Sequence, residues 1–145
     1  MIVLDTTALV YAVGDDHPLR RACQDLLVLV GDGRRRATTT IEVIHEFAHV
    51  RSRRRSRSDA VHYARRFAQA FAPLIVLDEA DLQVGLDLFE RHERLGAFDS
   101  LLAGVTLRRG FDGIVSADRA FADVDGLTYF DPAADGFVES LTNTG

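Results

Sequence analysis

Short apolar segments alternate with longer amphipathic segments along this chain, and that alternation is the feature that most constrains its fold. The apolar segments predict buried β-strands at Ile2–Leu4 and at residues 37–39, 74–77, 113–116 and 127–130. Strands separated by helices favour a parallel sheet, because each crossover returns the chain to the same end of the sheet and leaves helices on both faces. We therefore expect an α/β fold with a mainly parallel central sheet.

The amphipathic segments predict the helices between these strands. Apolar side chains recur at helical spacing in residues 6–13, 18–30, 40–53, 58–71, 79–95 and 99–107. Asp5 or Thr6 is a suitable N-cap for the first helix, whereas Gly96 and Gly110 are suitable ends for the last two. The helices on either side of the arginine-rich turn near residue 55 predict a helical hairpin. After Pro132 we expect a polar tail.

Length and composition predict a single domain over residues 1–145. A chain of 145 residues with 47% hydrophobic residues can bury a substantial core, and no apolar run reaches the ~18 residues that a membrane span requires. The first residues lack the basic region and cleavage site of a signal peptide, so we expect a cytoplasmic protein. The single cysteine, Cys23, excludes an internal disulfide and a cysteine zinc site, and its apolar setting predicts a buried, inert thiol.

The charge of the chain is unevenly distributed. The net charge is −5, which by itself argues against binding to nucleic acid, yet the region from Arg34 to Arg66 is strongly basic. Candidate contacts to nucleic-acid phosphates lie in its densest part, at Arg51, Arg53, Arg54 and Arg55. The alternative interpretation of the same run is a solvated helix end, and the sequence leaves both open.

Four acidic residues stand next to apolar segments, where charged side chains are unusual. They are Asp5, Glu46, Asp99 and Asp118. Asp5 and Asp118 follow predicted strands, and ligands of open parallel sheets bind beyond the carboxyl ends of the strands. Carboxylates that converge there need a cation to neutralise them, and an all-oxygen site that accepts phosphate oxygens is typical of Mg²⁺- or Mn²⁺-dependent phosphodiester hydrolysis. Taken one at a time, each acid could instead be a helix cap, a turn residue or a surface residue.

At these positions the sequence resembles the PIN-domain ribonucleases and, within them, the VapC toxins of type II toxin–antitoxin pairs. The resemblance covers nearly the whole chain and rests on segments at residues 2–10, 96–103, 114–118 and 129–132, together with Thr40 and Glu46-Phe47. It implies a three-layer α/β/α PIN-like fold, Mg²⁺- or Mn²⁺-dependent endoribonuclease activity, a homodimer and a small antitoxin protein as partner. It also implies that Asp5, Glu46, Asp99 and Asp118 form the catalytic metal site and that the hydroxyls of Thr7 and Ser116 support it. Glu42, one helical turn before Glu46, competes with it for the glutamate position.

A second motif overlaps the first. His45-Glu46-Phe47-Ala48-His49 matches the H-E-x-x-H pattern of zinc metallopeptidases, in which two histidines bind zinc and the glutamate is the general base. Such a site needs a third ligand downstream, and Arg51–Arg55 stands where the extended metzincin pattern would continue. A third hypothesis is a PIN-like interaction domain without catalytic activity. These alternatives differ in their metal: zinc for the peptidase, Mg²⁺ or Mn²⁺ for the nuclease and none for the scaffold.

Overall fold

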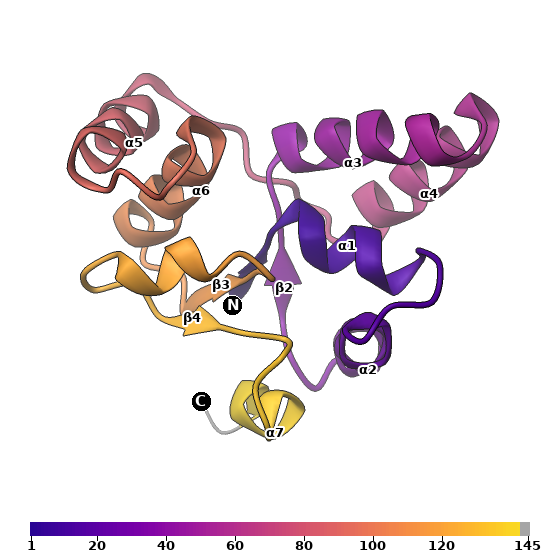
Figure 1. Ribbon diagram of the computed structural model, residues 1–145. Coiled ribbons are helices and arrows are strands. Elements are labelled where there is room, and N and C mark those ends of the chain that lie inside the picture. The colour runs from indigo at the N-terminus through magenta and orange to yellow at the C-terminus, as the bar shows by residue number, and fades with distance from the viewer. Residues whose placement is uncertain (143–145) are drawn as a thin grey trace.

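The protein alternates strands and helices as its sequence predicts (Figure 1). The structure is a computed structural model and describes residues 1–142. Its elements are β1 (Ile2–Leu4), α1 (Thr6–Ala12), α2 (Arg20–Gly31), β2 (Ala37–Thr38), α3 (Ile41–Arg54), α4 (Arg57–Ala70), α5 (Glu79–Arg91), α6 (Ala97–Arg108), β3 (Gly113–Val115), the 3₁₀ helix η1 (Arg119–Asp123), β4 (Tyr129–Phe130) and α7 (Phe137–Thr142).

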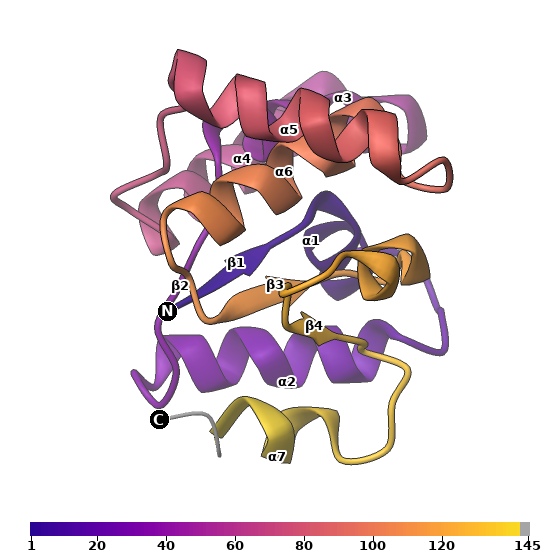
Figure 2. The ribbon, with the colours of Figure 1, turned by 90° about the vertical axis from the view of Figure 1, so that its left-hand side faces the viewer.

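The strands form one parallel sheet in the order β2-β1-β3-β4. Ile2 pairs with Ala37 on one side and with Gly113 on the other, which places β1 in the centre. Figure 2 shows α5 and α6 above the sheet and α2 and α7 below it, so that the molecule has three layers. This confirms the α/β/α fold with a parallel sheet, and it brings the carboxyl ends of β1 and β3 to the same edge.

The central strands are apolar throughout because helices cover both of their faces. The side chains of β1 and the Ile114 and Val115 side chains of β3 are completely buried. The predicted hairpin of α3 and α4 packs through aromatic rings: Phe47 meets Phe67 edge-on with centroids 5.0 Å apart, and Phe67 stacks on Phe71. The core therefore fixes the position of α3, which contributes several side chains to the site described below.

Three details of the predicted secondary structure are wrong. Residues 74–77 form no strand; Ile75 makes only an isolated bridge with Thr40, and Val76 is 65% exposed. Helix α5 ends at Arg91, and Gly96 is the N-cap of α6 instead of the end of α5. The expected polar tail contains α7, whose Phe137 and Leu141 are buried; residues 143–145 of that tail lie outside the described residues.

Helices α5 and α6 approach each other closely because glycines lie where they cross. A Cβ atom at Gly85 would lie 2.8 Å from the Cα of Leu101, and one at Gly104 would lie 2.9 Å from the nitrogen of Gly85. The pair is also joined by the buried carboxylate of Asp81 in α5. Arg108 donates to its Oδ1 at 2.7 Å, and Arg109 forms a further ion pair with it. Together these contacts hold α5 and α6 as one unit.

Two further expectations concern Cys23 and membranes. Cys23 is buried in α2, as predicted, and burial raises the pKa of its thiol to about 12. None of the helices in residues 1–142 is long and apolar enough to cross a membrane.

Candidate active site

Asp5 lies at the carboxyl end of β1 and is fixed by two hydroxyl groups. Thr7 Oγ1 and Ser116 Oγ both donate to Oδ2 of Asp5, each at 2.7 Å. Asp5 is also the N-cap of α1, with the backbone nitrogen of Thr7 donating to the same oxygen. Among the described residues these hydrogen bonds all end on Oδ2, and none reaches Oδ1. Capping of α1 therefore occupies only one of the two oxygens of this carboxylate.

Thr7 and Ser116 belong to a wider hydrogen-bond network that joins β1 to β3. The backbone nitrogens of Ala117 and Asp118 donate to Thr7 Oγ1 and Ser116 Oγ respectively, each at 2.9 Å. Ser116 is completely buried. Because both hydroxyls accept from the loop after β3 and donate to Asp5, they fix the two strand ends relative to each other.

Glu46 projects from α3 toward this edge, and Thr6 holds it there. The hydroxyl of Thr6, adjacent to Asp5 in the chain, donates to Oε2 of Glu46. Thr6 is a residue that the sequence reasoning missed, although its place beside Asp5 was a signal for it. Glu42 lines a neighbouring cavity, but unlike Glu46 it is absent from the lining of the cavity where all four acids meet. The structure therefore separates the two glutamates that the sequence could not distinguish.

Asp99 and Asp118 complete the group from α6 and from the loop after β3. Asp99 lies in the first turn of α6, three residues after its N-cap Gly96, so it is not the cap itself. Asp118 is the N-cap of η1, since the nitrogen of Ala120 donates to its Oδ1 at 2.9 Å. The interpretation of Asp118 as a turn residue is thus correct for one of its two carboxylate oxygens, Oδ1.

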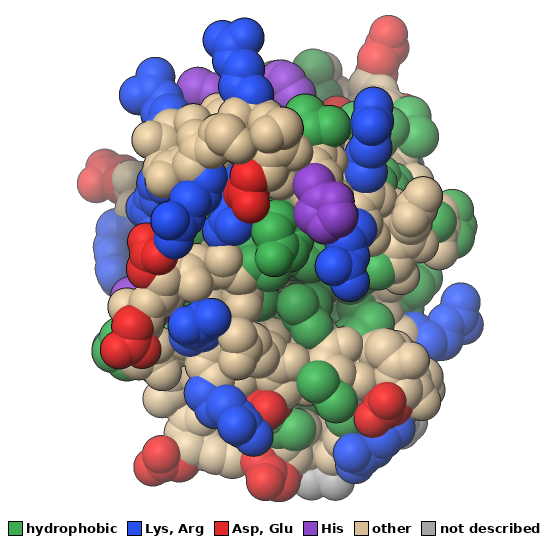
Figure 3. Space-filling view, turned by 90° about the vertical axis from the view of Figure 1, so that its right-hand side faces the viewer, with side chains coloured by type: hydrophobic (Ala, Val, Ile, Leu, Met, Phe, Trp, Pro, Cys, Tyr) green, Lys and Arg blue, Asp and Glu red, His purple; other side chains and the backbone are tan. Residues whose placement is uncertain are grey.

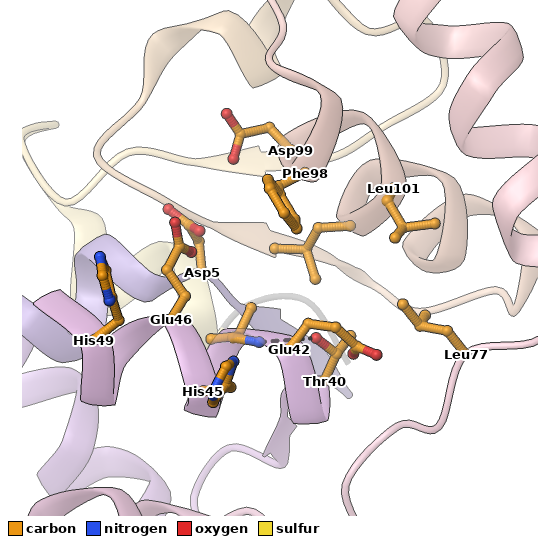
Figure 4. Close-up of a pocket in the computed structure, with 12 residues that line it drawn as sticks. Asp5, Thr40, Glu42, His45, Glu46, His49, Leu77, Phe98, Asp99 and Leu101 are labelled. Carbon is orange, nitrogen blue, oxygen red and sulfur yellow. Dashed lines mark hydrogen bonds between the residues drawn. The ribbon is translucent and has the colours of Figure 1, made fainter.

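All four acids line one cavity of about 290 Å³, together with Thr6, Thr7 and Arg54. Figure 4 shows that the carboxylates of Asp5 and Glu46 point toward the same side of the cavity, which is the side where Asp99 lies. Burial, and after it the negative charges of Asp5, Asp118 and Glu46, together raise the pKa of Asp99 from 3.8 to about 7. The neutral form of Asp99 is therefore favoured as long as no cation lies among the four acids.

The donors of this cavity are the ones that a hard divalent cation prefers. Carboxylate and hydroxyl oxygens line it, and a positive ion among them would relieve the repulsion that raises the pKa of Asp99. Within residues 1–142, no group of three or more His, Cys, Asp or Glu side chains is arranged to hold a metal ion directly. The oxygen donors of the cavity suit Mg²⁺ better than zinc, because zinc sites in proteins are built mainly from histidine nitrogens and cysteine sulfurs.

The H-E-x-x-H segment lies on the exposed side of α3. His45 and His49 are exposed and line the neighbouring cavity of about 320 Å³, together with Glu42 and Glu46. In the described part of the chain no third ligand joins them in a metal-binding group. The structure therefore gives no support to a zinc peptidase.

The predicted phosphate-binding arginines differ in what they contact. Arg51 is largely buried, donates to Asp59 at 2.5 Å and lies over the ring of Tyr63, and Arg55 pairs with Asp15. Arg53 and Arg54 are both exposed, and Arg54 also lines the cavity of the four acids. On the face shown in Figure 3, arginines gather with acidic side chains between them and do not form a continuous basic surface. Of the four predicted phosphate-binding arginines, Arg54 is thus the one that lines the cavity of the four acids.

Comparisons with known proteins agree with this geometry. The PIN domain model matches residues 2–127. Ribonuclease VapC7 of Mycobacterium tuberculosis strain ATCC 25618 / H37Rv is 48% identical over 145 residues, which cover 97% of this chain and 98% of the relative. Ribonuclease VapC23 of the same strain is 33% identical over 84% of this chain and 96% of its own length. VapC ribonuclease Mb1869c of Mycobacterium bovis is 29% identical over 88% of this chain and 97% of its own length.

The match to the family model extends from β1 to η1 and includes every residue that lines the cavity of the four acids. A family model that covers residues 2–127 includes Asp5, Glu46, Asp99 and Asp118 within one domain. The chain therefore belongs to the PIN-domain family and, within it, to the VapC ribonucleases.

Proposed function

We propose that this protein is the toxin of a toxin–antitoxin pair and that it hydrolyses RNA phosphodiester bonds with Mg²⁺ or Mn²⁺ held by Asp5, Glu46, Asp99 and Asp118. The observation that carries the proposal is the cavity lined by all four acids, in which burial and then the charges of the other three raise the pKa of Asp99. Endoribonuclease activity and dependence on a metal are the properties of the family to which the chain belongs.

A divalent ion bound there would stabilise the charge that develops on the phosphate and would activate a water molecule for attack. The protein's own contribution is to fix its carboxylates before RNA arrives. Thr7 and Ser116 orient Asp5, and Thr6 orients Glu46. Residues that position a ligand in this way reduce the cost of organising the site during the reaction.

Arg54 is the residue that we assign to the RNA phosphate. It lines the same cavity as the acids, whereas Arg51 and Arg55 are engaged by Asp59 and Asp15. A guanidinium group beside the carboxylates can donate two hydrogen bonds to phosphate oxygens. Arg53 is exposed on the same helix and can contact a neighbouring phosphate of the RNA backbone. We therefore keep Arg53 among the proposed RNA-binding residues.

The proposed partners are an antitoxin protein, RNA and a second copy of the chain. The surface that we assign to the second copy is an exposed apolar stripe on α5. Leu82, Leu86 and Phe89 lie on one face of the helix at i, i+4 and i+7, with exposed fractions of 45%, 49% and 48%. An RNA-cleaving toxin would act in the cytoplasm, where its RNA substrates are.

RNA cleavage in the presence and absence of metal tests the proposal. Wild type should cleave cellular RNA with Mg²⁺ or Mn²⁺ and lose activity in EDTA, and Asp5→Asn should be inactive with either ion. His45→Ala and His49→Ala should retain activity, since neither residue lines the cavity of the four acids. Cleavage by wild type in EDTA, or by Asp5→Asn with Mg²⁺, would contradict the proposed metal site.

A further inference from the structure

The cavity of about 320 Å³ next to the acids has an apolar wall that metal chemistry does not require. It shares Asp5, Glu46 and Asp99 with the cavity of the four acids, but its other side is formed by Val43, Leu77, Phe98, Leu101 and Leu102. Phe98 is 74% exposed, the largest exposed fraction among the exposed large hydrophobic residues of the described chain. An exposed aromatic ring in a concave site beside polar groups is typical of a ligand contact.

Phe98 and Asp99 are consecutive residues in the first turn of α6. Both residues line the same cavity, so a base that stacks on the Phe98 ring would lie beside one of the acids of the proposed metal site. Aromatic side chains bind unpaired RNA bases by stacking.

The opposite side of the cavity offers groups that can recognise a base edge. Figure 4 shows Glu42 and Thr40 across the cavity from Phe98, with His45 near them. A carboxylate accepts hydrogen bonds from an amino group, which guanine, adenine and cytosine carry and uracil lacks. An apolar side chain of a peptide could not form hydrogen bonds with these polar groups. Their presence therefore favours an RNA base as the ligand of this cavity.

We propose that this cavity binds the base of the nucleotide next to the cleaved phosphodiester, with Phe98 stacking on its face and Glu42 accepting from its amino group. This inference rests on the proposed nuclease function, because it places the phosphate beside the metal ion that the four acids would hold. It makes Phe98 and Glu42 the residues that determine which RNA sequences bind best.

Titration with nucleoside monophosphates tests this proposal without any cleavage step. Ribose 5-phosphate is the matched ligand without a base. In Mg²⁺, wild type should bind a monophosphate with an amino-bearing base about tenfold more tightly than ribose 5-phosphate, as stacking on one ring predicts. Phe98→Ala should abolish this difference, Phe98→Tyr should keep it, and Phe98→Leu should lose most of it. Glu42→Gln should weaken the preference for guanosine, adenosine and cytidine monophosphates over uridine monophosphate.

Each alternative outcome has a separate meaning. If all monophosphates bind no better than ribose 5-phosphate, or if Phe98→Leu binds them as wild type does, the cavity accommodates an apolar side chain of a protein partner and the proposal is overturned. If the base contributes to binding through Phe98 but the wild type cleaves no RNA, the base site stands and the nuclease function fails. Unchanged circular dichroism of the variants, and unchanged binding by Val28→Ala on α2, would show that the effects are local.

Discussion

Ser116 donates a hydrogen bond of 2.7 Å from Oγ to Oδ2 of Asp5 and thereby links the carboxyl ends of two neighbouring parallel strands. The serine is completely buried and accepts in turn from the nitrogen of Asp118 at 2.9 Å. A single hydroxyl group thus positions one proposed metal ligand and the backbone of another.

Replacement of Ser116 by alanine should weaken the metal site without unfolding the protein. Loss of a hydrogen bond that orients a ligand commonly costs 10–100-fold in metal affinity or activity, and we expect a loss of about that size in the apparent affinity for Mg²⁺. Titration of RNA cleavage with Mg²⁺ measures it. Thr106→Val is the matched control, since the buried hydroxyl of Thr106 donates only to the carbonyl oxygen of Leu102. Equal Mg²⁺ affinity of wild type and Ser116→Ala would contradict the prediction.

The raised pKa of Asp99 predicts how stability depends on pH when no metal is present. With a pKa raised from 3.8 to about 7, the folded protein holds this proton more tightly than the unfolded chain does. The contribution of Asp99 to stability is therefore fully present below pH ~4 and is lost as the pH rises toward 7. Urea unfolding in EDTA at pH 5 and pH 8 should show this decrease for wild type and a smaller one for Asp99→Asn. Mg²⁺ should stabilise wild type more than the variant. Identical pH profiles of the two proteins would refute the repulsion among the four acids.

Arg54 should account for part of the salt dependence of RNA binding. A contact to single-stranded RNA releases counterions and contributes about 0.7 to the slope of log affinity against log salt. Arg54→Gln should lower the slope by about this amount, as measured by fluorescence anisotropy at several salt concentrations. Arg91→Gln, an exposed arginine on α5, should leave the slope unchanged. An unchanged slope for Arg54→Gln would identify the arginine run as a solvated helix end.

The buried carboxylate of Asp81 should be important for stability and unimportant for metal binding. Asp81→Asn leaves Arg108 and Arg109 with the exposed Asp78 as their remaining acidic partner, which should cost about 3 kcal/mol, the lower end for a buried pair because both arginines reach water. The ion pairs hold the pKa of Asp81 far below its ordinary value, so its contribution is present above pH ~4 and is lost in acid. Denaturation at pH 7 measures the effect. A variant as stable as wild type would show that the arginines find equivalent partners.

The apolar stripe on α5 should control the oligomeric state. Leu86→Asp introduces a charge at its centre and should convert a dimer to a monomer at the same protein concentration, as measured by light scattering after gel filtration. Val28 is an equally apolar residue on α2 with an exposed fraction of 59%, and Val28→Asp is the control that should remain dimeric. A wild-type monomer, or a dimeric Leu86→Asp variant, would place any dimer contact elsewhere.

The sequence predicted the two strands that position the site, because each is a short apolar run with an acid close behind it, Asp5 directly after β1 and Asp118 three residues after the end of β3. It also predicted that Asp5 and Asp118 would meet, since the carboxyl ends of parallel strands share an edge of the sheet. The prediction of a strand at residues 74–77 was wrong. In this apolar run Val76 is exposed, and only Ile75 pairs with another segment. The sequence did not predict α7, because a six-residue helix with two buried side chains gives too short a pattern.

The distinction between neighbouring candidates in the site needed tertiary contacts. Glu42 and Glu46 lie one turn apart on α3, and the hydroxyl of Thr6, far away in the sequence, holds Glu46 toward the acids. In the same way, Asp59 and Asp15 engage Arg51 and Arg55, while Arg54 faces the cavity. No local pattern distinguishes these residues, because their partners come from other elements.

The contact between Gly85 and Gly104 has a mechanical consequence. Because the two backbones touch, α5 cannot slide or roll against α6 without a steric collision, and a displacement of one helix is transmitted to the other. Helix α6 carries Asp99 in its first turn, and α5 carries the stripe proposed to meet a second copy. A second copy bound at that stripe would therefore act on the position of Asp99 through two helices that move together.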